Sequence, residues 1–193
     1  MNQTKEITVK VNLTKQELID LLINKQYKKI DNYIMNDIYF VKKDTDLSQN
    51  SLNLFKNYIL IRDLNELTFP EQNKIQYTHK TKEYDDKENI ISESKTSVEI
   101  KNKEEGIKFL NSLNYQELIK ITDLIEVYQK DNFKICLQYV NDKYLFIEIE
   151  SNDKYPTIDS LIEELNKTNI PYDKSNYFVK KAQIIFEEQY KKN

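Results

Sequence analysis

Charged side chains alternate with apolar residues along several segments of this chain. The residues that share this pattern are Glu6, Lys10, Arg62, Lys80, Glu93, Glu148 and Glu150. Carboxylate oxygens are the ligands that Mg²⁺ and Mn²⁺ prefer, and lysine and arginine neutralise phosphate oxygens. If these segments converge, they form a site for a polyphosphate bound with a divalent metal. The alternative is a sheet with one face in water, where the charges are only solvated.

The rest of the composition excludes other kinds of site. The 193 residues include one glycine (Gly106), one histidine (His79) and one cysteine (Cys136). A phosphate-binding loop needs several glycines close together, a zinc site needs several Cys or His ligands, and a disulfide needs two cysteines. A catalytic triad would have to be built on His79 alone. Carboxylates, lysines, tyrosines and one arginine therefore remain for chemistry.

The charge balance bears on partners. Lys plus Arg number 29 and Asp plus Glu number 32, which gives a net charge of −3 and does not indicate stable nucleic-acid binding. Arg62 is the sole arginine. Lysine replaces arginine poorly where the side chain makes a bidentate contact with a phosphate, so Arg62 is a candidate for such a contact. The alternative is that this one arginine has survived by chance.

The apolar runs and the single cysteine indicate the cellular location. No run approaches 18 apolar residues, so no membrane span is predicted. The N-terminus is charged and alternating, unlike a signal peptide. A lone cysteine agrees with a reducing compartment, and we expect a cytoplasmic protein.

The elements that position these residues follow from periodicity. Alternating Ile7, Val9 and Val11 predict a strand, and Thr14 with Glu17 predicts a capping box before a helix. Strands are predicted at 6–11, 31–43, 57–63, 74–83, 90–101, 118–129, 133–140 and 144–150. Helices are predicted at 15–25, 102–113, 157–167 and 175–190, with a charged turn at 85–89. The pattern indicates an α+β fold with a mostly antiparallel sheet and one domain over 1–193.

Several short motifs resemble those of one family. Glu6-x-Thr8-x-Lys10 resembles the Glu-x-Glu-x-Lys signature of the CYTH superfamily, which comprises class IV adenylate cyclases, thiamine triphosphatases and inorganic triphosphatases. Four later segments follow in the family's order: Tyr58-Ile59-Leu60-Ile61-Arg62, Tyr77-Thr78-His79-Lys80, Ser92-Glu93-Ser94-Lys95 and Phe146-Ile147-Glu148-Ile149-Glu150. They resemble its Leu-Arg-Ile-Arg, Leu-Thr-Tyr-Lys, Arg-x-Glu-x-Glu and Phe-x-Glu-Ile-Glu segments.

The resemblance implies a fold and a set of roles. The implied fold is an eight-stranded closed antiparallel β-barrel, the triphosphate tunnel, over about 5–150, with flanking helices and a helical part at about 157–191. The implied catalytic and metal-binding residues are Glu6, Glu148 and Glu150, with Mg or Mn as cofactor. The implied substrate-binding residues are Lys10, Arg62, Lys80 and Glu93. The substrate would be a nucleotide or other triphosphate that is hydrolysed, or ATP that is cyclised. We also predict a homodimer.

Some positions depart from the family pattern. The positions where the family has a charged residue and this chain has another type are Thr8, Leu60, Ile91, Ile125 and Gln138, and Asp123 stands where the family has a lysine. Each charge-assisted phosphate contact contributes about 1.5–3 kcal/mol, so the loss of basic residues at Leu60, Ile91 and Ile125 weakens triphosphate binding by roughly 10³-fold or more, unless lysines such as Lys82, Lys95 or Lys120 substitute. This leaves two alternatives open: a catalytically silent module that binds another phosphorylated ligand or a protein, and an accidental resemblance with solvated charges.

Overall fold

The computed structural model describes residues 5–84 and 90–190, except for the side chains of residues 90–93. The chain divides into two compact units, one formed by residues 1–33 and 123–179 and the other by residues 34–122 and 180–193. We call them unit 1 and unit 2. The predicted charged turn at 85–89 lies outside the described residues. The prediction of one domain over 1–193 stays a prediction.

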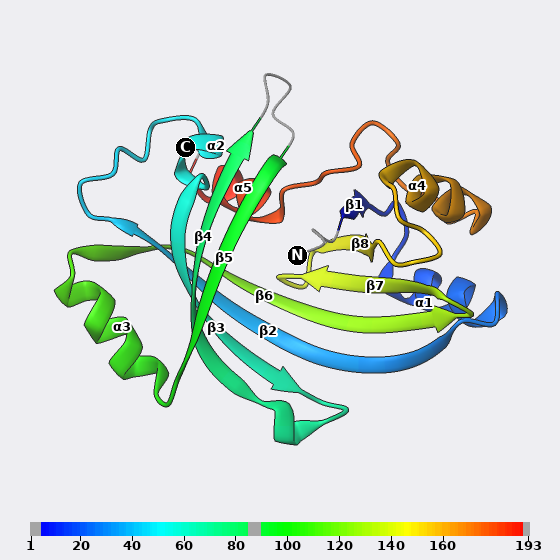
Figure 1. Ribbon diagram of the computed structural model, residues 1–193, viewed down its shortest axis with the longest axis horizontal. Helices are drawn as coiled ribbons and strands as arrows, with labels where there is room; N and C mark the ends of the chain where they lie inside the picture. The colour runs from blue at the N-terminus through cyan, green and yellow to red at the C-terminus, as the bar shows by residue number, and fades with distance from the viewer. Residues whose placement is uncertain (1–4, 85–89, 191–193) are drawn as a thin grey trace. The chain divides into compact units, whose positions relative to one another are not determined.

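Eight antiparallel strands form the sheet of the described residues, as the sequence predicts (Figure 1). In sheet order they are β1 (Glu6–Lys10), β8 (Tyr144–Glu150), β7 (Phe133–Val140), β6 (Tyr115–Lys130), β2 (Lys28–Lys42), β3 (Asn57–Glu66), β4 (Lys74–Tyr84) and β5 (Ile90–Ile100). The α+β class is confirmed. The predicted closed barrel is wrong, because this order has two ends, β1 and β5, which do not pair with each other in the described part of the chain.

The outer edge of β1 is occupied by the chain itself. The backbone N–H of Thr8 donates to the carbonyl of Tyr177 at 2.9 Å, and the N–H of Val179 donates to the carbonyl of Thr8 at 3.0 Å. Further along, the N–H of Asp173 donates to the carbonyl of Lys10 at 2.9 Å. The groups that would close a barrel through β1 are therefore already paired, which is the physical reason that this prediction fails.

The same segment corrects a helix boundary. The predicted helix at 175–190 is α5 and begins only at Lys181, ending at Tyr190. Residues 177–179 pair with β1 instead of forming helical hydrogen bonds. Long-range pairing has overridden the local helical pattern here.

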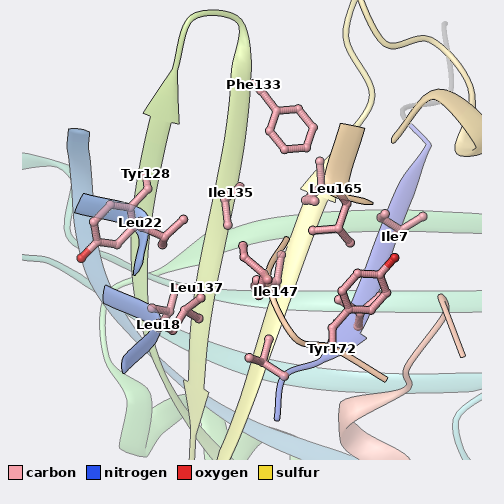
Figure 2. Packing of buried hydrophobic residues seen from close by; sticks show 14 of the residues in the cluster. Ile7, Leu18, Leu22, Tyr128, Phe133, Ile135, Leu137, Ile147, Leu165 and Tyr172 are labelled. Atoms are coloured by element: carbon pink, nitrogen blue, oxygen red, sulfur yellow. The ribbon is translucent and has the colours of Figure 1, made fainter. Parts of the chain in front are cut away.

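Unit 1 has one hydrophobic core beneath its strands (Figure 2). Helix α1 (Lys15–Asn24) places Leu18 and Leu22, four positions apart, against this core, and α4 (Ile158–Lys167) adds Leu165. Alternation along β8 sends Ile147 to the core. The predicted capping box is present: the Glu17 N–H donates to the Thr14 hydroxyl at 3.3 Å, and the Thr14 N–H donates to the Glu17 carboxylate at 2.8 Å.

Unit 2 packs α3 (Lys103–Ser112) against β3, β4 and β5. The sole glycine, Gly106, lies in α3, and a Cβ there would come within 2.7 Å of Ile100 Cδ1. The Tyr77 hydroxyl donates to the Gly106 carbonyl at 2.9 Å, and a side chain at position 106 would require the end of the Ile100 side chain to move. Two short elements, α2 (Ser51–Leu54) and the 3₁₀ helix η1 (Pro70–Gln72), were not predicted.

No helix within the described ranges 5–84 and 90–190 is long and apolar enough to cross a membrane.

Candidate functional site

Three carboxylates meet where β1 pairs with β8. Glu6 lies opposite Glu150 across the strand pair, and Thr8 lies opposite Glu148. One carboxylate oxygen of each glutamate lies within 4.8 Å of the other two. The period of two residues explains the arrangement, because Glu148 and Glu150 share the face opposite the one that carries Ile147 to the core. We call Glu6, Glu148 and Glu150 the carboxylate cluster.

The cluster suits a hard divalent cation. Like charges directly opposite each other in an antiparallel pair are destabilising, so Glu6 and Glu150 repel in the absence of a counter-ion. Glu148 is half-buried while Glu6 and Glu150 are exposed, which leaves the oxygens accessible. All donors are carboxylate oxygens, the set that Mg²⁺, Mn²⁺ and Ca²⁺ prefer over softer metals. The residues present therefore fit the metal that the sequence predicts.

Lys10 adds a cation to the same face of β1. It follows Glu6 by four positions, is exposed, and its Nζ lies 5.9 Å from the centre of the Tyr144 ring. Thr8, between them on this face, is 6% exposed and takes the place of the family's second glutamate. β1 therefore contributes one carboxylate and one ammonium group to this face.

Arg62 is held by a partner that the sequence did not reveal. Its Nε and Nη2 donate to the two carboxylate oxygens of Asp37 at 2.8 and 2.7 Å. Burial alone would lower the pKa of Arg62, but the hydrogen bonds and charge of Asp37 raise it above its usual value. The guanidinium is therefore charged and fixed in orientation. One signal was available, since Asp37 is a lone acid beside the apolar run from Ile38 to Val41.

The remaining predicted residues lie in unit 2. Lys80 on β4 is opposite Tyr58 on β3 and opposite Lys95 on β5. Glu93 has its backbone in β5, opposite Lys82, and its side chain lies outside the described residues. The structure thus brings together Glu6, Glu148 and Glu150 in unit 1, with Lys10 on the same face of β1, and places Arg62 and Lys80 in unit 2. A ligand shared by the two groups stays a prediction.

Sequence reasoning also missed a buried charge in unit 1. Glu126 lies on the α1 side of β6 and accepts a hydrogen bond from the Tyr128 hydroxyl at 2.8 Å. The ammonium groups of Lys15 and Lys29 lie 3.1 and 3.3 Å from its carboxylate oxygens. Burial alone would raise the pKa of Glu126, but the hydrogen bond from Tyr128 and the two lysines lower it below its usual value. This cluster anchors α1 to the sheet on the face away from the carboxylate cluster.

Glu126 should make stability depend on pH. Its pKa is lowered in the folded chain, so its contribution is present above the unfolded-state pKa, ordinarily 4.5, and is lost as the pH falls through the folded value. We expect Glu126→Gln to reduce the free energy of unfolding by about 1 kcal/mol at pH 7, because charge-assisted bonds to partly exposed lysines are lost. Urea unfolding at pH 7 and pH 3 measures this: the difference between variant and wild type should be smaller at pH 3 than at pH 7. An equal difference at both pH values would contradict it.

A family model described as "CYTH domain" matches residues 4–182. A Methanocaldococcus jannaschii protein named "Putative adenylate cyclase MJ0240" is 25% identical over 176 residues, which cover 87% of this chain and 91% of that protein. The sequence-based resemblance is therefore confirmed.

Solved structures agree on the fold. The PH1819 protein from Pyrococcus horikoshii OT3 is similar with a TM-score of 0.69 and 18% identity, over 96% of this chain and 99% of that one. The structure reported as "Putative adenylyl cyclase HpAC1 from Hippeastrum reveals a dominant triphophatase activity" has a TM-score of 0.61 and 14% identity, over 96% of both chains. At these identities the likeness concerns the fold alone.

Proposed function

Because the chain belongs to the CYTH domain family, we propose that it binds a triphosphate compound together with Mg²⁺ or Mn²⁺ and hydrolyses it. The observation that supports this most is the carboxylate cluster, whose oxygens lie within 4.8 Å of one another. Three acidic side chains at one end of a strand pair are unfavourable without a cation. A metal-dependent activity would explain why three carboxylates lie together there.

The residues of unit 1 have distinct roles in this proposal. Glu6, Glu148 and Glu150 hold the metal through carboxylate oxygens. When bound, the ion neutralises charge on the leaving phosphate and orients the attacking oxygen. Lys10, on the same face of β1, binds a phosphate oxygen of the same ligand.

The residues of unit 2 have the supporting role of binding phosphate. Lys80 offers an ammonium group, and Arg62 offers the nitrogen that Asp37 does not engage, Nη1. Asp37 fixes the guanidinium plane in advance, so little side-chain entropy is lost when a phosphate binds. We propose that each of these two groups binds a phosphate oxygen.

The departures from the family pattern set the expected strength of binding. Leu60 and Ile125 are each 1% exposed, so these positions are packed and present no charge to a ligand. We therefore propose weaker triphosphate binding than a site with arginines at both positions would have. A catalytically silent binding module remains the second candidate, favoured by the buried Thr8 at the position of the second glutamate.

Turnover assays separate these candidates. The purified chain is incubated with tripolyphosphate, thiamine triphosphate or ATP, with Mg²⁺ or Mn²⁺, and phosphate, pyrophosphate and cyclic AMP are measured separately. We expect phosphate release that EDTA abolishes. Cyclic AMP with pyrophosphate would instead support the cyclase activity for which the M. jannaschii relative is named. No turnover of any compound, with tripolyphosphate still raising the melting temperature, would overturn hydrolysis in favour of the silent module.

A further inference from the structure

Lys10 has two diagonal neighbours on β8 that its side chain can reach. It lies opposite Phe146 in the pair of β1 with β8, so Tyr144 and Glu148 are the diagonal neighbours on the same face. Such positions are about 7–8 Å apart, within reach of a long side chain. Glu148 belongs to the carboxylate cluster, whereas Tyr144 lies on the side of Lys10 away from it. The neighbour that Lys10 contacts therefore decides how near its ammonium group lies to the cluster.

The side chain of Lys10 contacts Tyr144. Its Nζ lies 5.9 Å from the centre of the Tyr144 ring, a distance at which the ring face attracts an ammonium group. In the part of the chain that the structure describes, no ion pair joins Lys10 to Glu148. The Tyr144 ring is stacked on that of Phe146, with the ring centres 6.2 Å apart and an angle of 25° between the planes. The ring that contacts Lys10 is therefore itself supported by a neighbouring ring of β8.

We propose that Tyr144 is a positioning residue that keeps the ammonium group of Lys10 away from Glu148. This inference rests on the proposed roles of Lys10 and of the carboxylate cluster. An ammonium group paired with Glu148 would compete with a divalent cation for that carboxylate, and it would be less available to a phosphate. Held against Tyr144, Lys10 leaves the carboxylates to the metal and stays on the face that they share.

Two other charged groups lie near this contact. Lys143, in the turn before β8, has its Nζ 5.0 Å from the centre of the Tyr144 ring. The N–H of Asp173 donates to the carbonyl of Lys10 at 2.9 Å. The carboxylate of Asp173 accepts hydrogen bonds from the N–H and the hydroxyl of Ser175 at 2.9 and 2.6 Å, and these bonds lower its pKa, with a smaller contribution from the charge of Lys10. Lys143 and Asp173 are therefore the positions for control variants.

Nuclear magnetic resonance measures the contact without metal or substrate. In protein labelled with ¹³C-lysine, the ε-methylene protons of Lys10 are identified by their absence in Lys10→Arg, and the ring current of Tyr144 should shift them upfield. We expect this shift to persist in Tyr144→Phe, which keeps the ring, and to disappear in Tyr144→Leu. Lys143→Met and Asp173→Asn should leave it unchanged. An unshifted wild-type signal, or a shift that survives in Tyr144→Leu, would overturn the proposal.

The affinity for Mn²⁺ measures the consequence of this contact. Tyr144→Leu allows Lys10 to reach Glu148, so we expect Mn²⁺ to bind roughly two- to fivefold more weakly than to wild type in isothermal titration, the range for a partly exposed ion pair. Tyr144→Phe should bind Mn²⁺ like wild type. In a Lys10→Met background, Tyr144→Leu should have no further effect on the affinity. Equal weakening in both backgrounds would overturn the positioning role, because Tyr144 would then act independently of Lys10.

These outcomes differ from a failure of the proposed function, because neither measurement uses turnover. A chain that binds Mn²⁺ but turns over no triphosphate would contradict hydrolysis, and the dependence of the Mn²⁺ affinity on Lys10 would still test Tyr144. A wild-type chain that binds no Mn²⁺ would contradict the metal site, and the shift of the Lys10 signal would still decide the positioning role.

Discussion

Replacing Glu148 by Gln lowers metal-dependent phosphate release by roughly 100-fold, the equivalent of about 2.7 kcal/mol of lost transition-state stabilisation. Glu148 is the half-buried member of the carboxylate cluster; it lies opposite Thr8, two positions along β8 from Glu150. An amide of the same shape keeps one oxygen but removes the charge that holds a divalent ion. Initial rates at saturating Mn²⁺ measure the loss.

Two controls separate this effect from a loss of folding. Glu163→Gln changes an exposed glutamate of α4 that lies 3.2 Å from Lys167, and it should leave the rate unchanged. The melting temperature of Glu148→Gln without metal should equal or exceed that of wild type, because the variant reduces repulsion among three carboxylates. A Glu148→Gln protein with wild-type turnover would contradict its role as a ligand.

Asp37→Ala lowers the free energy of unfolding by about 3 kcal/mol. Asp37 is buried and makes two hydrogen bonds to the guanidinium of Arg62, which is itself largely covered. Removing the acid leaves a charged arginine without its counter-ion in a poorly hydrated place. Urea unfolding at pH 7 measures the difference.

A double variant isolates the pair. Asp37→Ala combined with Arg62→Met removes both charges, so the combined cost should be smaller than the sum of the two single costs. The single change Asp37→Asn serves as the conservative control, since it retains the shape but not the charge. A cost below about 1 kcal/mol for Asp37→Ala would show that Arg62 is adequately solvated without its partner.

Local periodicity predicted most of the elements. The strands at 133–140 and 144–150 agree with β7 and β8, because strict alternation and the Asn- and Asp-containing turns beside them are properties of short segments. α2 and η1 were missed because four and three residues carry no helical period. Element boundaries that depend on neighbours close in sequence could therefore be predicted from the sequence.

Features that depend on contacts between residues far apart in the sequence could not be predicted from local patterns. The late start of α5 and the open sheet both depend on residues 177–179 pairing with β1, about 170 positions away in the sequence. The roles of Glu126 and Asp37 were missed for the same reason, since each carboxylate forms an ion pair with a basic side chain on another element. The grouping of Glu6 with Glu148 and Glu150 was expected only through the family resemblance.

Direct metal binding tests the central claim that the carboxylate cluster holds a divalent ion. Isothermal titration of Mn²⁺ into the chain, with and without tripolyphosphate, should show about one ion bound per chain. Glu148→Gln should bind it roughly tenfold or more weakly, and Glu163→Gln should bind it like wild type. A wild-type chain that takes up no Mn²⁺ under either condition, or a Glu148→Gln variant with unchanged affinity, would contradict metal binding by Glu6, Glu148 and Glu150.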